Sequence, residues 1–195
     1  MAPNTRGLRR ASTNVGWMGL NHLAIMVLRL CYIVAAARLL DAEDYGLMAY
    51  SQSWYIAVMP LVFLGVTIQF GREIGADRAA GLQFAFATRR PRLLIALAVT
   101  LTLSVVAMAV EPVPENVAFI IVFALTLAPR AMAAGSQGVL TGLECAQLTF
   151  INNLSWRTVE LLFAIVALLA GAGILSLALI HLASWLLQAL NLSLI

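Results

Sequence analysis

Arg29 lies in the middle of an apolar segment, where a charged side chain is unusual. In a helix over residues 16–37 it falls about 20 Å along an element roughly 33 Å long. If that helix crosses a membrane, the guanidinium is too deep to reach the surface. Its insertion into hydrocarbon costs at least ~2.5–3.5 kcal/mol, so it is expected to face protein, water or a ligand. His22 lies within roughly 20° of the same face and Tyr32 one turn later, which makes a polar stripe of three residues.

A second polar stripe follows the last apolar segment of the chain. His181, Ser184, Gln188 and Asn191 are spaced three, four and three residues apart, which places them on one face of a helix. Hydrogen bonds between such side chains contribute about 0.6 kcal/mol each and hold membrane helices together. Polar side chains also line cavities for hydrated ligands. The stripe fits both interpretations, helix packing and cavity lining, equally well.

Glu160 is an acid placed inside an apolar segment. Arg157 precedes it by three residues, which puts the two side chains on neighbouring positions of one helix face. We therefore predict a buried ion pair of Arg157 with Glu160, with Arg130 near it. The alternative is a buried pair of Glu160 with Arg29. If Arg29 is left free by the first arrangement, a functional role is predicted for it.

Catalytic machinery is absent from the sequence. It contains no serine–histidine–acid set, no paired carboxylates and no phosphate-binding loop, and its acids other than Glu160 fall in connections. Cys31 and Cys145 lie far apart without metal-ligand spacing. We expect no enzyme activity, no catalytic residue, no metal site and no cofactor.

Composition requires a bilayer around these residues. The chain has 195 residues, of which 62% are hydrophobic and 11% charged, with a mean hydropathy of +0.93. Soluble domains run at roughly 45–50% apolar and about 25% charged, so a water-soluble enzyme, a disulfide scaffold and a disordered tail are excluded. The net charge is +3, and all 12 basic residues are arginine. In so apolar a chain this balance indicates membrane topology rather than nucleic-acid binding.

The predicted fold class is an all-α integral membrane protein with six transmembrane helices. A span takes about 20 apolar residues plus a connection, so this length allows roughly six. The N-terminal segment, residues 1–15, is expected in the cytoplasm. Polar residues interrupt the first span, which is therefore expected to be a retained helix rather than a signal peptide. Residues 135–153 are either a helical extension or an interfacial piece. The predicted spans are 16–37, 45–70, 93–110, 117–134, 156–172 and 174–194.

Arginines concentrate on one side of the predicted membrane. If six spans alternate, eight arginines fall before the first span or between the second and third. The opposite connections contain only Arg38 beside five acids. Because arginine-rich connections stay in the cytoplasm, both termini are predicted there. The eight arginines are Arg6, Arg9, Arg10, Arg72, Arg78, Arg89, Arg90 and Arg92.

The stretch ARLLDAEDYGL, residues 37–47, resembles the first helix junction of a known family. That family is the polysaccharide transporters, or oligosaccharide (O-antigen type) flippases, of the multidrug/oligosaccharidyl-lipid/polysaccharide exporter superfamily. The family pattern reads alanine-arginine-leucine-leucine-glycine, an acidic pair, an aromatic residue and Gly-Leu, and Asp41 replaces the usual glycine. Residues 64–66, followed by Arg72-Glu73, are similar to its second helix and cytoplasmic end. The resemblance covers residues 14–92; the remainder agrees in hydropathy alone.

The resemblance implies translocation of a polyprenyl-diphosphate-linked oligosaccharide across the bacterial cytoplasmic membrane. This step serves surface polysaccharide or lipopolysaccharide biosynthesis, with glycan polymerases or glycosyltransferases as candidate partners. The anionic, hydrated headgroup cannot cross hydrocarbon unaided, so Arg29 would neutralise the diphosphate. The remaining expected contacts are His22, Tyr32, His181, Ser184, Gln188 and Asn191.

Members of that family have two six-helix lobes, related by pseudo-symmetry and arranged as an inverted V. The resemblance therefore implies that residues 16–195 form the N-terminal lobe alone, a fragment that lacks its C-terminal lobe. Two alternatives remain: a drug/cation antiporter of the same superfamily, and a non-transporting membrane subunit of a glycan-assembly complex. An antiporter would favour an acid at the depth of Arg29, so the arginine favours an anionic substrate.

Overall fold

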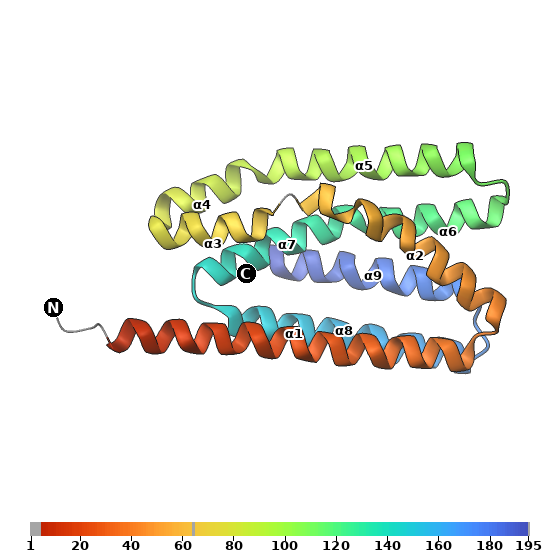
Figure 1. The fold of residues 1–195 in the computed structure, drawn as a ribbon, viewed down its shortest axis with the longest axis horizontal. Coiled ribbons are helices and arrows are strands. Elements are labelled where there is room, and N and C mark those ends of the chain that lie inside the picture. The colour runs from red at the N-terminus through yellow and green to blue at the C-terminus, as the bar shows by residue number, and fades with distance from the viewer. Residues whose placement is uncertain (1–4, 64, 195) are drawn as a thin grey trace.

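The computed structural model describes residues 5–63 and 65–194, with side chains from Ser12 onward, as a bundle of long helices (Figure 1). The side chains of Arg6, Arg9 and Arg10, which entered the topology prediction, lie outside the described part. The described residues contain helices and short connections, without a strand. The helices are α1 (Thr5–Leu39), α2 (Ala42–Phe63), α3 (Val66–Ala76), α4 (Arg78–Ala87), α5 (Arg89–Val110), α6 (Pro114–Leu125), α7 (Leu127–Gly142), α8 (Ala146–Leu169) and α9 (Ile174–Ser193).

Single helices, or two helices joined end to end, form rods that are long and apolar enough to cross a membrane. Within the described residues there are six such stretches, which confirms the predicted all-helical class and the number of spans. They are Ser12–Leu39, Ala42–Ala76, Arg78–Val110, Pro114–Gly142, Ala146–Leu169 and Ile174–Ser193.

The rods extend beyond the predicted spans because hydropathy marks the apolar part of a helix rather than its ends. The α1 helix begins at Thr5 instead of residue 16. The α7 helix runs on to Gly142, and α8 begins at Ala146 instead of residue 156. Residues 135–153 are thus two helix ends joined by a short turn, which matches the helical alternative for that segment.

Three rods contain a local break. Gly65 separates α2 from α3 with a φ of 67°, a left-handed conformation that favours glycine. Thr88 separates α4 from α5, and its hydroxyl donates to the carbonyl of Phe84 at 2.8 Å. Thr126 separates α6 from α7, shortly before Pro129, which has no N–H to donate to the preceding turn. These breaks allow the rods to change direction around the bundle.

Close helix packing depends on small residues. The α3 helix approaches α7 so closely that a Cβ at Gly138 would lie 2.9 Å from the Cα of Thr67. A Cβ at Gly142 would lie 2.9 Å from the Cβ of Ile74. On the other side of the bundle α1 packs along α8 (Figure 1).

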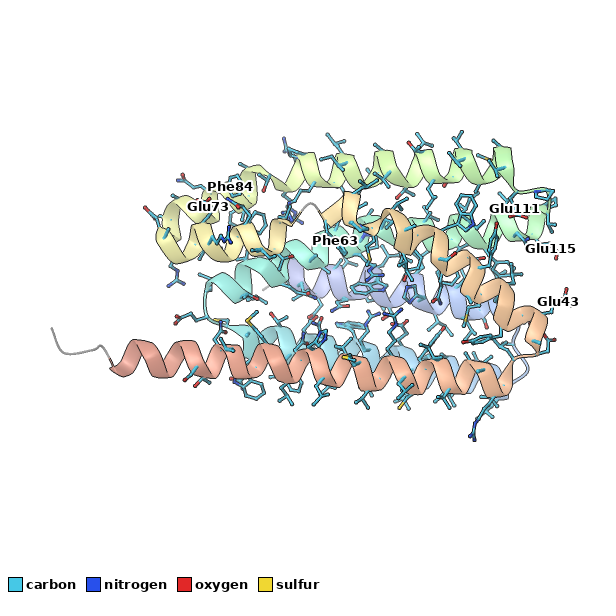
Figure 2. All side chains as sticks on the ribbon, viewed as in Figure 1. Glu43, Phe63, Glu73, Phe84, Glu111 and Glu115 are labelled. Atoms are coloured by element: carbon cyan, nitrogen blue, oxygen red, sulfur yellow. The ribbon has the colours of Figure 1, made fainter. Side chains whose placement is uncertain are left out.

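The two ends of the bundle carry opposite charge. Glu43, Glu111 and Glu115 gather at one end, whereas both chain termini point toward the other (Figures 1 and 2). That other end holds α3, α4 and the start of α5, where five exposed or half-buried arginines outnumber the two acids Glu73 and Asp77. The asymmetry agrees with the arginine count, and the orientation in a membrane stays a prediction.

The acidic end includes a hydrogen-bonded carboxylate with a perturbed pKa. The hydroxyl of Tyr50 donates to Oε2 of Glu111 at 2.7 Å, and the amide of Asn116 donates to Oε1 at 3.0 Å. These bonds, the tyrosine first, hold the pKa of the Glu111 carboxyl below its ordinary value. The stability that this Tyr50–Glu111 bond adds between α2 and the α5–α6 connection is therefore fully present above the ordinary carboxyl pKa. It is lost as pH falls through the lowered pKa of Glu111.

We expect Tyr50→Phe to raise the pKa of Glu111 back toward the ordinary carboxyl value, because the largest stabilising bond to the charged form is removed. Carbon-13 NMR titration of the Glu111 side-chain carboxyl measures this directly. Asn116→Ala is the matched comparison and should give a smaller rise, since its bond is the weaker cause. An unchanged Glu111 titration curve in Tyr50→Phe would show that the hydroxyl does not stabilise the carboxylate.

Candidate functional site

A cavity of about 250 Å³ lies among α1, α2, α7, α8 and α9, midway along the bundle. Its depth follows from Arg157, which stands about 17 Å from the first residue of α8 at 1.5 Å per residue. Polar side chains reach it from all five helices, and aliphatic residues of α1 and α2 complete the walls. The polar lining includes Arg29, Tyr55, Arg130, Glu160, His181 and Trp185.

Glu160 binds two other side chains of the site, Arg157 and His181. Its side chain is 9% exposed, and its Oε2 accepts a close hydrogen bond from Nη1 of Arg157 one turn earlier on α8. Its Oε1 lies 2.6 Å from Nδ1 of His181 on α9. The structure thus brings together the pair predicted from the i, i+3 spacing. Glu160 contacts these two residues and not Arg29, its alternative partner.

Arg130 joins this cluster from α7. Its Nη1 donates to the hydroxyl of Tyr55 at 3.0 Å. Its guanidinium carbon lies 4.5 Å from the centroid of the Trp185 ring, and that of Arg157 lies 4.0 Å from the same centroid. The electron-rich face of an indole attracts cations, so Trp185 helps to hold two arginines close together despite their repulsion. Neither Tyr55 nor Trp185 was predicted as a site residue.

The polar stripe of α9 divides between the two interpretations. His181 lines the cavity. Ser184 and Gln188 are buried behind it, where their side-chain oxygens accept from Nη2 of Arg157 at 3.0 and 2.8 Å. Asn191 accepts from the amide of Asn152 on α8 at 2.5 Å. Helix packing therefore describes Ser184, Gln188 and Asn191, and cavity lining describes His181.

A network of amide side chains continues from Gln188 away from the cavity. Its Nε2 lies 3.1 Å from Oδ1 of Asn152 and 2.6 Å from Oδ1 of Asn153. Gln137 of α7 also donates to Asn153, at 2.8 Å, and Asn153 donates to Oδ1 of Asn21 on α1 at 3.1 Å. We call these residues, with Asn191, the amide network. The α8 and α7 members were not predicted from the sequence, although Asn153, Arg157 and Glu160 repeat the four-and-three spacing found on α9.

The α1 helix contributes two of its three predicted residues. Arg29 and Tyr32 line the cavity, whereas His22 is exposed and lies outside it. The α1 residue that meets the interior at that level is its neighbour Asn21, because one residue turns the helix face by about 100°. Of the predicted three-residue stripe, the cavity lining thus includes Arg29 and Tyr32. Among the described residues, Arg29 has no hydrogen-bond or ion-pair partner.

The cavity has an excess of positive charge and of donors. Three arginines and one carboxylate line it, which leaves a net charge of +2 when His181 is neutral. Nε of Arg130, Nε of Arg157 and Nε1 of Trp185 are buried without an acceptor in the described part of the chain. The net positive charge suits the site to a ligand rich in acceptor oxygens and negative charge.

These features define a multi-pass helical membrane protein with a cationic cavity between its helices. Comparison of the chain with protein-family models, with curated proteins and with solved structures finds no match in any of the three.

Proposed function

We propose that this protein is a flippase for a lipid-linked oligosaccharide, which it moves across the bacterial cytoplasmic membrane for surface polysaccharide or lipopolysaccharide biosynthesis. The observation that supports this most is the cavity charge, three arginines against Glu160. A diphosphate carries negative charge and acceptor oxygens, which match the arginines of the cavity. The polyprenyl chain can stay in the surrounding hydrocarbon while the headgroup crosses.

In this proposal Arg29 is the first contact of the diphosphate. It is exposed at the edge of the cavity and has no protein partner among the described residues, whereas Arg157 is already bound to Glu160. An unpaired guanidinium at this depth is costly against lipid. A second lobe facing α1, as in the two-lobed transporters that residues 37–47 resemble, would enclose both Arg29 and the headgroup. The arginine-rich end, with both termini, would face the cytoplasm and the enzymes that build the glycan.

The test is complementation in the host with its own copy of the gene deleted. We expect Arg29→Ala and Arg29→Glu to lose most surface polysaccharide, and Arg29→Lys to retain part of it because the charge is kept. Arg78→Ala, an exposed arginine of α4, is the matched control and should complement fully. Surface polysaccharide is measured by immunoblot at matched membrane levels of protein. Full complementation by both Arg29→Ala and Arg29→Glu would overturn the cavity role.

The alternatives fit the site less well. A drug/cation antiporter would have to admit an organic cation into a cavity of net positive charge, which repels it. A non-transporting subunit accounts for the amide network as helix packing but leaves the unpaired Arg29 and the donors without an acceptor unexplained. Full complementation by the Arg29 variants would favour this second alternative.

A further inference from the structure

A second cavity, of about 300 Å³, lies at the arginine-rich end among α4, α5, α7 and α9. Most of its lining is apolar, including Phe86 of α4, Met132 of α7 and Leu192 of α9. The charged residues in the described lining are Arg89 and Arg92, both from the first turn of α5. We call it the α4–α5 groove.

Arg92 is held in place by groups around it. Its Nε donates to the carbonyl of Thr88 at 3.2 Å, and its guanidinium carbon lies 4.7 Å from the centroid of the Phe70 ring. Gly135 of α7 makes room for it, because a Cβ there would lie 2.0 Å from Nη1 of Arg92. A side chain fixed in this way loses little further freedom when it binds a ligand.

Among the described residues, no acid forms an ion pair with Arg89 or Arg92. In the described part of the chain both ion pairs involve Glu160, in the other cavity. Arg89 and Arg92 are three residues apart and therefore lie on neighbouring positions of one helix face. The groove thus combines two uncompensated guanidinium groups with apolar walls, and Phe86 on its rim is 70% exposed.

We propose that the α4–α5 groove binds an anionic phospholipid of the surrounding membrane. The phosphate contacts Arg89 and Arg92, and an acyl chain lies against the apolar walls. Basic pockets between membrane helices on the cytoplasmic side recognise acidic lipid headgroups in this way. Arginine pairs with phosphate through parallel hydrogen bonds, and a zwitterionic lipid brings its own cation, which the two arginines repel. The site is separate from the central cavity and does not rest on the proposed transport function.

The test is lipid binding by the purified full chain in detergent, measured by native mass spectrometry with phosphatidylglycerol as probe. We expect tighter retention of phosphatidylglycerol than of phosphatidylcholine. Arg89→Gln/Arg92→Gln should weaken phosphatidylglycerol binding about tenfold. Arg78→Gln/Arg90→Gln, which removes the same charge from the same end but outside the groove, should leave it within about twofold.

Two further arms keep the result decisive. Arg89→Gln alone, at an exposed residue, replaces the double variant if that variant fails to fold, and should weaken binding about threefold. Inorganic phosphate at the same concentration should not displace the lipid, because it lacks the acyl chain. The proposal would be overturned if the protein retained the two lipids equally, or if inorganic phosphate fully displaced the lipid. It would also be overturned if the control pair lost as much binding as the groove variant, or if neither Arg89→Gln/Arg92→Gln nor Arg89→Gln lost any.

Discussion

Replacing Glu160 by leucine is expected to lower the free energy of unfolding by about 3–5 kcal/mol. The carboxylate is the acid that binds both Arg157 and His181, and its removal leaves the Arg157 charge buried without compensation. Arg130 then adds to the cost, because the two guanidinium groups share the face of Trp185. Leucine keeps most of the side-chain volume, so the loss reports electrostatics rather than a cavity.

Unfolding in mixed micelles with increasing dodecyl sulfate, followed by tryptophan fluorescence, measures this loss. Glu160→Gln, which retains one hydrogen-bonding oxygen, should cost less than Glu160→Leu. Glu115→Leu, at an exposed acid of the α5–α6 end, is the control and should stay within about 0.5 kcal/mol of the parent. If Arg157→Met is combined with Glu160→Leu, the double variant should be more stable than the sum of the single losses predicts. Equal stability of Glu160→Leu and Glu115→Leu would contradict a supporting role for the ion pair.

The sequence predicted the fold class because bilayer insertion depends on local hydropathy, which a single segment displays on its own. Helix ends were predicted less well, since a polar helical end and a loop look alike in hydropathy. Asn152 and Asn153 illustrate this: their segment was predicted as either a helical extension or an interfacial piece. They lie well inside α8, paired with residues of α1, α7 and α9.

Some residues of the site were predicted from the sequence and others were not. Arg29, Arg157 and Glu160 were predicted because an ionisable residue inside an apolar segment needs a partner wherever the helix turns. Tyr55 and Trp185 were missed because aromatic residues also serve as ordinary apolar packing, and their part in the site depends on where Arg130 arrives from α7. Helix rotation, set by packing across the bundle, decides such contacts.

Arg157 joins the cavity to the amide network. Its Nη1 binds Glu160 on the cavity side, and its Nη2 binds Ser184 and Gln188 on the other. A ligand that draws Arg157 or Glu160 toward itself must therefore act on the hydrogen bonds between α8 and α9. Gln188 is the residue that carries those bonds onward, because it also contacts both Asn152 and Asn153.

We expect Gln188→Leu to lower the free energy of unfolding by about 2–4 kcal/mol, because it leaves several buried polar groups with fewer partners. Gln188 is 0% exposed, so water cannot replace the lost bonds. Gln188→Glu keeps an acceptor for Arg157 while it removes the donor to Asn152 and Asn153.

The same micellar unfolding measurement checks this second effect, with Gln147→Leu, an exposed position of α8, as control. Hydrogen exchange of the α1 and α9 amides adds a local readout. If the amide network ties α1 to the rest of the bundle through Asn153 and Asn21, exchange in Gln188→Leu should accelerate in both helices. Faster exchange confined to α9 would mean that α1 is held by its other contacts, which are its packing on α8 and the hydrogen bonds of Asn14 to Thr141 and Ala146. A Gln188→Leu variant as stable as Gln147→Leu would mean that the amide network does not stabilise the bundle.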